Sequence, residues 1–405
     1  MSRPLWTIAI CAAVILAITA GIRQGFGLFI LPMTQDYGVA RETFALSIGL
    51  QNLLWGIGAP IAGAIADRYG PRLVAAVGAL IYAAGMAAMV VDAGGAQMIV
   101  SGLLAGIGLS GAGFSVVLGA VGRAAPPAYR AKALAIASFG GSVGMFASLP
   151  YTHVLIEDTG WIASMLIIAA TIALTAPLAY GLGGGKPVDG ASAEPVGAPP
   201  PVDMRTALRD AFGDRSFVLL TTAFFVCGFQ LAFIVVHLPP YLGDQGMAPW
   251  LAAAALTLLG ISNIIGTIAC GWLGQRFEKR LVLISLYVIR AVLLGGFVSL
   301  PISEWTVLVF ATGMGFTWLP TIPLTNGLVA HIYGPTYLST LFGVVFLSHQ
   351  LGGFMGPWVG GLVFDASGSY GAVWWLAAAL GLVAAVLHWP IDERRRRVPA
   401  AAPAR

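Results

Sequence analysis

Two arginines of this 405-residue chain lie inside long apolar stretches, where a charge is costly. Arg23 falls within residues 7–32, and Arg290 lies ten residues into 281–300. A charged side chain at such a depth in a membrane costs about 2.5–3.5 kcal/mol or more, so each arginine needs water or a partner. All seventeen acidic residues fall in predicted loops, termini or the ends of apolar stretches. A planar guanidinium binds a carboxylate through two hydrogen bonds, which favours an anionic ligand.

Each arginine also has a structural interpretation. Arg23 could bond to carbonyls of unwound backbone, and Arg290 could brace neighbouring helices with help from Tyr287. The residue types do not decide between a ligand and a brace.

Other polar side chains in apolar stretches widen the candidate site. His349 lies about eleven residues into 338–363 and could accept a proton or donate to a carboxylate, although a neutral buried histidine is the alternative. His237 and His153 are weaker candidates, and polar groups such as Asn52 often simply bond between helices. The substrate-binding residues predicted from these considerations are Arg23, His349, Gln350, Arg290, Tyr151, Asn263 and Asn326.

Enzymatic chemistry is not expected. Ser110 in GLSG and Ser142 in GGSVG resemble serine-hydrolase patterns, but both lie in hydrophobic helices, where small residues serve close packing. The three cysteines, Cys11, Cys227 and Cys270, lack metal-ligand spacing. No nucleotide-binding loop of the GxxxxGK[ST] kind occurs. We therefore predict no catalytic residues, no metal and no cofactor.

The elements that position these residues are membrane spans. Hydrophobic residues make up 58% of the chain, and only 38 residues are charged, where a soluble chain of this length carries about 100. The mean hydropathy is +0.87. The basic residues do not gather into one patch, which argues against nucleic acid. The composition predicts an all-α protein that crosses the lipid bilayer many times.

A span needs about 20 mostly apolar residues. Twelve such stretches occur, at 7–32, 44–66, 73–92, 96–121, 133–156, 161–183, 216–240, 250–274, 281–300, 305–329, 338–363 and 371–390. Pro320 and Pro323 are expected to break or bend the tenth. The domains are then a six-helix half over residues 1–183, a cytoplasmic linker over 184–215 with a short amphipathic helix at 203–212, a second half over 216–390 and a basic tail over 391–405.

The basic residues predict the orientation. Of the 21 lysines and arginines, eighteen fall on the side of the termini, Arg41 alone falls on the other side, and Arg23 and Arg290 lie within spans. This positive-inside bias predicts that both termini are cytoplasmic. We expect a multi-pass protein of the plasma membrane, here a bacterial inner membrane.

The two predicted halves repeat each other. A shift of 208 residues places Gly63 on Gly271, Gly144 on Gly352, Glu157 on Asp365 and Gly160 on Gly368. Two six-span halves with a site at their interface are typical of transporters.

A loop motif connects the chain to a known family. Between the second and third spans the sequence reads GAIADRYGPR, from Gly63 to Arg72, which resembles the major facilitator superfamily signature GxxxD[RK]xGx[RK]. A degenerate copy runs from Gly271 to Arg280. The resemblance implies the major facilitator fold, usually as a monomer, and a conformational latch formed by Gly63, Asp67, Arg68, Gly70 and Arg72. It also implies that the first span lines the central cavity and that the ninth is peripheral.

A narrower resemblance covers most of the chain. The GIRQGFGLFILPM segment at Gly21 and the GGFMGP and GGLVFDASGSY segments from Gly352 to Tyr370 are similar to the monocarboxylate and oxalate/formate transporter branch. That branch moves small organic carboxylates, often with a proton. Asn263 and Thr267 align with an aspartate and an arginine of the eukaryotic carriers, so that charged pair is not present.

These observations predict a secondary active transporter of small organic anions that works by alternating access. Proton symport is the leading mode of coupling, in which the second solute is a proton. In the exchange alternative the second solute is a counter-anion. Anion exchange of the oxalate/formate type and efflux of drugs or neutral metabolites are the alternatives.

Overall fold

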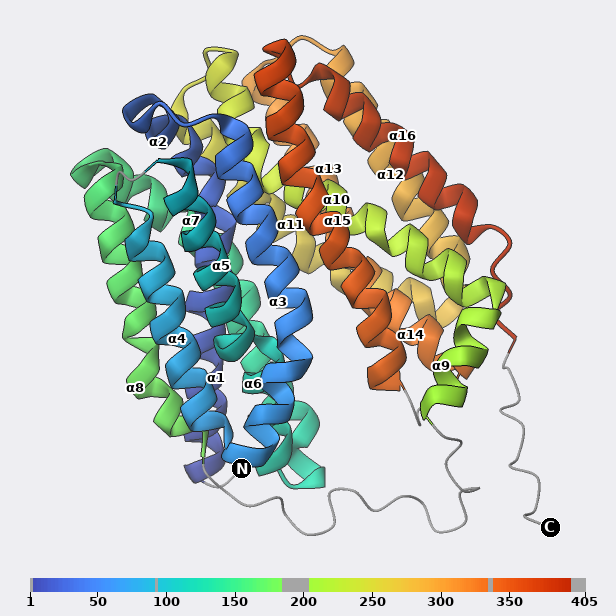
Figure 1. Ribbon diagram of the computed structural model, residues 1–405. Helices are drawn as coiled ribbons and strands as arrows, with labels where there is room; N and C mark the ends of the chain where they lie inside the picture. The colour runs from blue at the N-terminus through green and yellow to red at the C-terminus, as the bar shows by residue number, and fades with distance from the viewer. Residues whose placement is uncertain (1–2, 92–93, 184–203, 334–337, 395–405) are drawn as a thin grey trace, which may run out of the picture.

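The computed structural model describes residues 3–91, 94–183, 204–333 and 338–394, and these are almost wholly helical without a strand. Two groups of helices stand side by side (Figure 1). The first group comprises α1 (Arg3–Ile22), the 3₁₀-helix η1 (Arg23–Phe29), α2 (Ile30–Tyr37), α3 (Arg41–Tyr69), α4 (Pro71–Ala88), α5 (Gly95–Ala112), α6 (Phe114–Ala124), α7 (Pro127–Ala173), α8 (Thr175–Ala179) and η2 (Tyr180–Leu182). The second comprises α9 (Met204–Gly213), α10 (Arg215–Asp244), α11 (Pro249–Arg276), α12 (Lys279–Ser299), α13 (Glu304–Thr317), α14 (Thr321–Tyr333), α15 (Leu338–Ser367) and α16 (Gly371–His388). The predicted all-α membrane fold is confirmed.

The number of long apolar helices is close to the predicted number of spans. Within the described ranges, ten helical segments are long and apolar enough to cross a membrane. One of them, Lys132–Leu182, contains a break at Gly160, whose φ of 76° interrupts the helix, so it holds two spans. The 30-residue helix α15 is long enough to cross a membrane but is not one of the ten apolar segments. Only with α15 included does the number of spans reach the predicted twelve.

Two spans are interrupted near their middles. The first changes from α-helix to 3₁₀-helix at Arg23, which the prediction of one span over 7–32 did not include. The tenth is broken between α13 and α14, next to Pro320 and ahead of Pro323, as predicted. Both breaks bring polar groups to the membrane interior, where an unbroken helix would keep its backbone groups bonded to each other.

The repeat is visible in how helices pack. In the first group Gly144 of α7 touches the backbone of Ala17 in α1, and 208 residues later Gly352 of α15 touches the backbone of Phe225 in α10. A Cβ at either glycine would overlap that backbone, so only glycine permits these close approaches. Gly160 and Gly368, which also correspond, have φ values of 76° and 70° and end equivalent helices.

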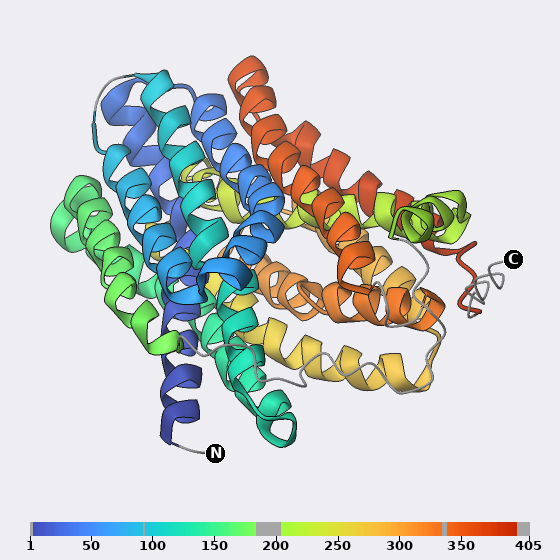
Figure 2. The same cartoon turned by 60° about the horizontal axis from the view of Figure 1, so that its bottom comes forward.

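The two ends of the molecule differ. The start of α1 and the α3–α4 connection lie at the bottom of Figure 1, which we call the termini end. The α2–α3, α10–α11 and α15–α16 connections lie at the opposite end, called here the far end. Seen with its bottom turned forward, the molecule shows the first group mainly to the left and the second mainly to the right, in contact with each other (Figure 2). The helix α9 lies at the termini end, over most of the stretch predicted to form an amphipathic helix, whereas residues 184–203 and 395–405 lie outside the described ranges.

Candidate functional site

A cavity of about 570 Å³ lies between the two groups of helices. The first group contributes residues of η1, α3, α6 and α7, and the second contributes residues of α10, α11, α14, α15 and the α13–α14 connection. Four of the predicted site residues line it, namely Arg23, Asn263, His349 and Gln350. Most of the remaining lining is apolar, which suits a small ligand held by a few polar groups.

Arg23 is placed in the cavity by the 3₁₀-helix η1. Gly27 in the same element lies against the backbone of Val235 and Val236, so this part of the chain approaches α10 closely. The Nη1 of Arg23 donates a 2.7 Å hydrogen bond to Oδ1 of Asn52, and its guanidinium lies 4.9 Å from the centre of the Trp55 ring. The arginine is thus oriented by neutral groups and keeps donors free for a ligand.

A chain of hydrogen bonds extends from Arg23 across to the second group. Asn52 Nδ2 donates to the carbonyl of Gly353 over 3.0 Å, and Gln350 Nε2 donates to the carbonyl of Asn52 over 3.0 Å. The Oε1 of Gln350 lies 3.0 Å from Nδ1 of His349. Since an amide oxygen only accepts, His349 carries its hydrogen on Nδ1, and Nε2 keeps a lone pair.

The Nε2 of His349 is the free end of this network. It is a buried atom without a hydrogen-bond partner in the described part of the chain. The ring lies between Phe224 and Phe346, with ring centres 4.9 Å and 5.8 Å away. The network therefore joins a cation of one helix group to an unoccupied proton acceptor of the other.

Asn263 marks the broken tenth span. Its Oδ1 accepts a 2.9 Å hydrogen bond from the backbone N–H of Leu319, between α13 and α14. Thr267, one turn along α11, donates to the same oxygen over 3.5 Å. Asn263 therefore stabilises the unwound segment and exposes its amide group to the cavity.

Arg290 lies elsewhere. Its side chain is fully buried inside the second group, outside the cavity lining. Its Nη2 donates to the carbonyls of Thr317 and Trp318 where α13 ends, and Nη1 lies 3.4 Å from both Cys227 Sγ and Gln230 Oε1. This geometry matches the structural role considered for Arg290, in which it braces neighbouring helices, rather than the role of a substrate-binding residue.

Tyr151 and Asn326 also lie away from the cavity lining. Tyr151 is 39% exposed on α7, where its hydroxyl contacts Thr171 Oγ1 at 3.2 Å. Asn326 is on α14, and its Oδ1 is buried without a partner among the described residues. The structure does not bring either residue together with Arg23.

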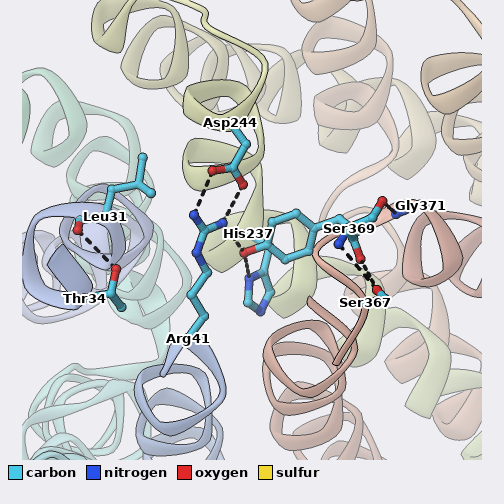
Figure 3. Close-up of polar contacts among 9 residues, drawn as sticks. Leu31, Thr34, Arg41, His237, Asp244, Ser367, Ser369 and Gly371 are labelled. Atoms are coloured by element: carbon cyan, nitrogen blue, oxygen red, sulfur yellow. Dashed lines mark hydrogen bonds and ion pairs between the residues drawn. The ribbon is translucent and has the colours of Figure 1, made fainter. Parts of the chain in front are cut away.

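A polar cluster at the far end connects the two groups (Figure 3). Arg41 at the start of α3 donates to both carboxylate oxygens of Asp244 on α10, at 2.5 Å and 2.7 Å, and to the hydroxyl of Tyr370 at 3.1 Å. Glu42 donates its backbone N–H to Asp365 over 2.7 Å and accepts from Trp358 Nε1 over 3.0 Å. We call Arg41, Glu42, Asp244, Asp365 and Tyr370 the far-end gate.

Local geometry holds Tyr370 in the gate. Gly368, with φ 70°, ends α15, and the hydroxyls of Ser367 and Ser369 cap the turn that follows. Burial raises the pKa of Tyr370 to about 12, against the opposing charge of Arg41, so the hydroxyl keeps its proton at neutral pH. The sequence did not identify this gate, although Arg41 was the single basic residue assigned to that side.

The predicted latch lies at the termini end, in the α3–α4 connection. Nothing is within 4 Å of the Cβ position of Gly63, and Arg68 and Arg72 are exposed. Gly70, with φ 95°, turns the chain from α3 into α4. The side chain of Asp67 lies outside the described part.

Comparisons with known proteins agree with this architecture. The sequence model of the Major Facilitator Superfamily matches residues 10–357 and again 255–404. Similar proteins include Monocarboxylate transporter 13 of Rattus norvegicus, 25% identical over 92% of this chain and 86% of that one. Another is the Uncharacterized MFS-type transporter YcxA of Bacillus subtilis, 26% identical over 91% of this chain and 90% of that one.

Solved structures share the fold. A D-xylose-proton symporter superposes with a TM-score of 0.71 at 14% identity, covering 97% of this chain and 99% of that chain. A bacterial homologue of the human lysosomal transporter Spinster, in an inward-facing and unoccupied conformation, also gives 0.71, at 15% identity, covering 96% and 95%.

Proposed function

The chain belongs to the Major Facilitator Superfamily, and from this premise we propose that it carries a small monocarboxylate together with a proton. The observation that carries the proposal is the network from Arg23 through Asn52 and Gln350 to His349. Among the described residues that line the cavity, Arg23 is the only one with a permanent charge. A carboxylate is the natural counter-ion, because it matches the guanidinium in charge and in geometry.

The proton would be held by His349. Its Nε2 has a lone pair and no hydrogen-bond partner among the described residues, and His349 lines the same cavity as Arg23. With an anion on Arg23 and a proton on His349, the loaded cavity gains no net charge, which lowers the cost of moving it through the membrane. The name of the rat relative, a monocarboxylate transporter, supports the same substrate class.

The termini end would face the cytoplasm of a bacterial inner membrane, as the basic residues predict. The far-end gate would then be external and closed, and the latch motif would face the cytoplasm. In this proposal the structure is an inward-facing state, and transport as a monomer proceeds by rocking the two helix groups about the cavity.

Uptake into proteoliposomes tests the proposal. Labelled pyruvate, lactate, formate and oxalate would be offered with and without an inward proton gradient, to wild type, Arg23→Gln and His349→Gln. Lys132→Gln is the matched control, because it removes an exposed positive charge far from the cavity lining.

We expect gradient-driven monocarboxylate uptake that Lys132→Gln keeps and Arg23→Gln loses by at least about 30-fold, the equivalent of 2 kcal/mol. His349→Gln should uncouple uptake from the gradient. Uptake that does not depend on the proton gradient but requires an anion inside the vesicles would support anion exchange instead. Normal uptake by Arg23→Gln would contradict the proposal, and movement of neutral compounds alone would support efflux.

A further inference from the structure

A second histidine, His237, lies directly beneath the far-end gate. It is on α10, its side chain is fully buried, and it lies outside the cavity lining. Its Nε2 is 2.7 Å from the carbonyl oxygen of Pro357, and its Nδ1 is 3.1 Å from the hydroxyl of Tyr370. A carbonyl only accepts, so the hydrogen of the neutral ring is on Nε2 and Nδ1 is an acceptor.

This tautomer fixes which group donates in each hydrogen bond from Arg41 to Pro357. Tyr370 must donate its hydroxyl hydrogen to Nδ1 of His237, and its oxygen accepts from Nη1 of Arg41. Arg41 belongs to the first helix group and His237 to the second (Figure 3), and Tyr370 and Pro357 also belong to the second. The state of His237 therefore depends on whether the two groups meet at the far end.

We propose that His237 is a proton-binding site of the far-end gate, vacant while the gate is closed and filled when it opens. The inference rests on the proposed function only in taking the far end as external and its gate as able to open.

The closed gate opposes a proton on His237 in two ways. A hydrogen on Nδ1 would face the hydroxyl hydrogen of Tyr370, and Tyr370 would lose its acceptor. A positive imidazolium would also lie one hydroxyl group away from the guanidinium of Arg41. When Arg41 leaves with the first group, the hydroxyl oxygen is free to accept from Nδ1, and the repulsion disappears.

The neighbouring acids do not compensate for that charge. On α10, Asp244 is engaged by Arg41, and Tyr241 is a neutral phenol. On α15, Asp365 accepts from the backbone of Glu42, and on α3 the carboxylate of Glu42 accepts from Trp358. The ring also lies near the aromatic side chain of Phe233, with 5.6 Å between ring centres. None of these carboxylates has a hydrogen bond to His237 among the described residues.

External acid should therefore hold the gate open. A ligand that binds one of two states shifts their ratio by its differential affinity. One proton bound only to the open gate raises the open-to-closed ratio by up to about tenfold for each pH unit below the pKa of the exposed histidine. Closing the gate returns that proton to the outside.

Distance measurement across the gate tests this. Spin labels at Gln35→Cys and Gln245→Cys, both exposed at the far end, would report its opening in nanodiscs, in a background with the three native cysteines replaced by alanine. No substrate is added, and pH is varied from about 8 to 5, the range in which an accessible histidine titrates.

The matched variant is His237→Gln. Its amide can donate to Pro357 and accept from Tyr370, yet it cannot take up a proton. We expect wild type and His349→Gln to open on acidification and His237→Gln to lose that response. Tyr370→Phe should weaken it, because the opposing hydroxyl hydrogen is gone, and serves if His237→Gln does not fold.

An unchanged pH response in His237→Gln would overturn the inference and assign the effect to the gate carboxylates. A wild-type gate that stays closed at all pH values would also overturn it. The distance measurement needs no transported anion. Its result therefore tests the inference about His237 independently of the proposal that the protein carries carboxylates.

Discussion

At the scale of single residues, Arg23 and Arg290 show what sequence can and cannot predict. Both were recognisable as costly charges in apolar stretches. The helix α12 is apolar nearly all round, so no periodicity indicates which neighbour Arg290 faces. The structure directs Arg23 to the cavity and Arg290 to the carbonyls of Thr317 and Trp318. The contacts of His237 could not be predicted, because Tyr370, which lies 3.1 Å from its Nδ1, and Arg41, which donates to Tyr370, are far from it in the sequence.

The brace formed by Arg290 predicts a loss of stability. Arg290→Leu removes the donor to two buried carbonyls at the α13–α14 break, and a buried polar group left unsatisfied costs about 1–3 kcal/mol. We expect a lower thermal midpoint in detergent, with Lys132→Leu close to wild type. A variant with unchanged midpoint but abolished carboxylate binding would make Arg290 a ligand instead.

At the scale of elements, hydropathy predicts the spans well because the bilayer sets their length. Proline likewise predicted the break ahead of α14, since it cannot continue the hydrogen bonds of a helix. The 3₁₀-helix η1 has no such local signal, because close contact with α10 accompanies it. The sequence showed Gly144 and Gly352 only as corresponding positions of a repeat. The structure shows what they pack against, namely Ala17 of α1 and Phe225 of α10.

Glycine packing predicts a position-specific effect. Gly144→Ala places a methyl group in the backbone of Ala17, and overpacking costs about 1–3 kcal/mol. Gly296→Ala on α12 meets open space and gains helix propensity, so it should match or exceed wild type. Thermal midpoints and monodispersity of the two variants would be compared. Equal midpoints would show that α1 and α7 do not depend on this contact.

At the scale of the whole molecule, the two ends differ in the contacts that their polar elements make. The far-end gate joins the helix groups through Arg41 and Glu42, whereas a Cβ built on Gly63 of the latch would have no described atom within 4 Å. The loop motif predicted where a latch lies but not which state the protein adopts, because one sequence must serve both states of the cycle. Arg23, His349 and Gln350 come together only through the interface of the two groups, so local pattern could not show their hydrogen bonds.

Equilibrium binding of labelled pyruvate and lactate to the purified protein examines the cavity directly, without requiring a complete transport cycle. Wild type and Lys132→Gln should bind alike. Arg23→Gln should bind at least about 30-fold more weakly, because removing one partner of a buried charge pair costs 2 kcal/mol or more. Equal affinity of wild type and Arg23→Gln for both anions would contradict the assignment of the cavity as a carboxylate site.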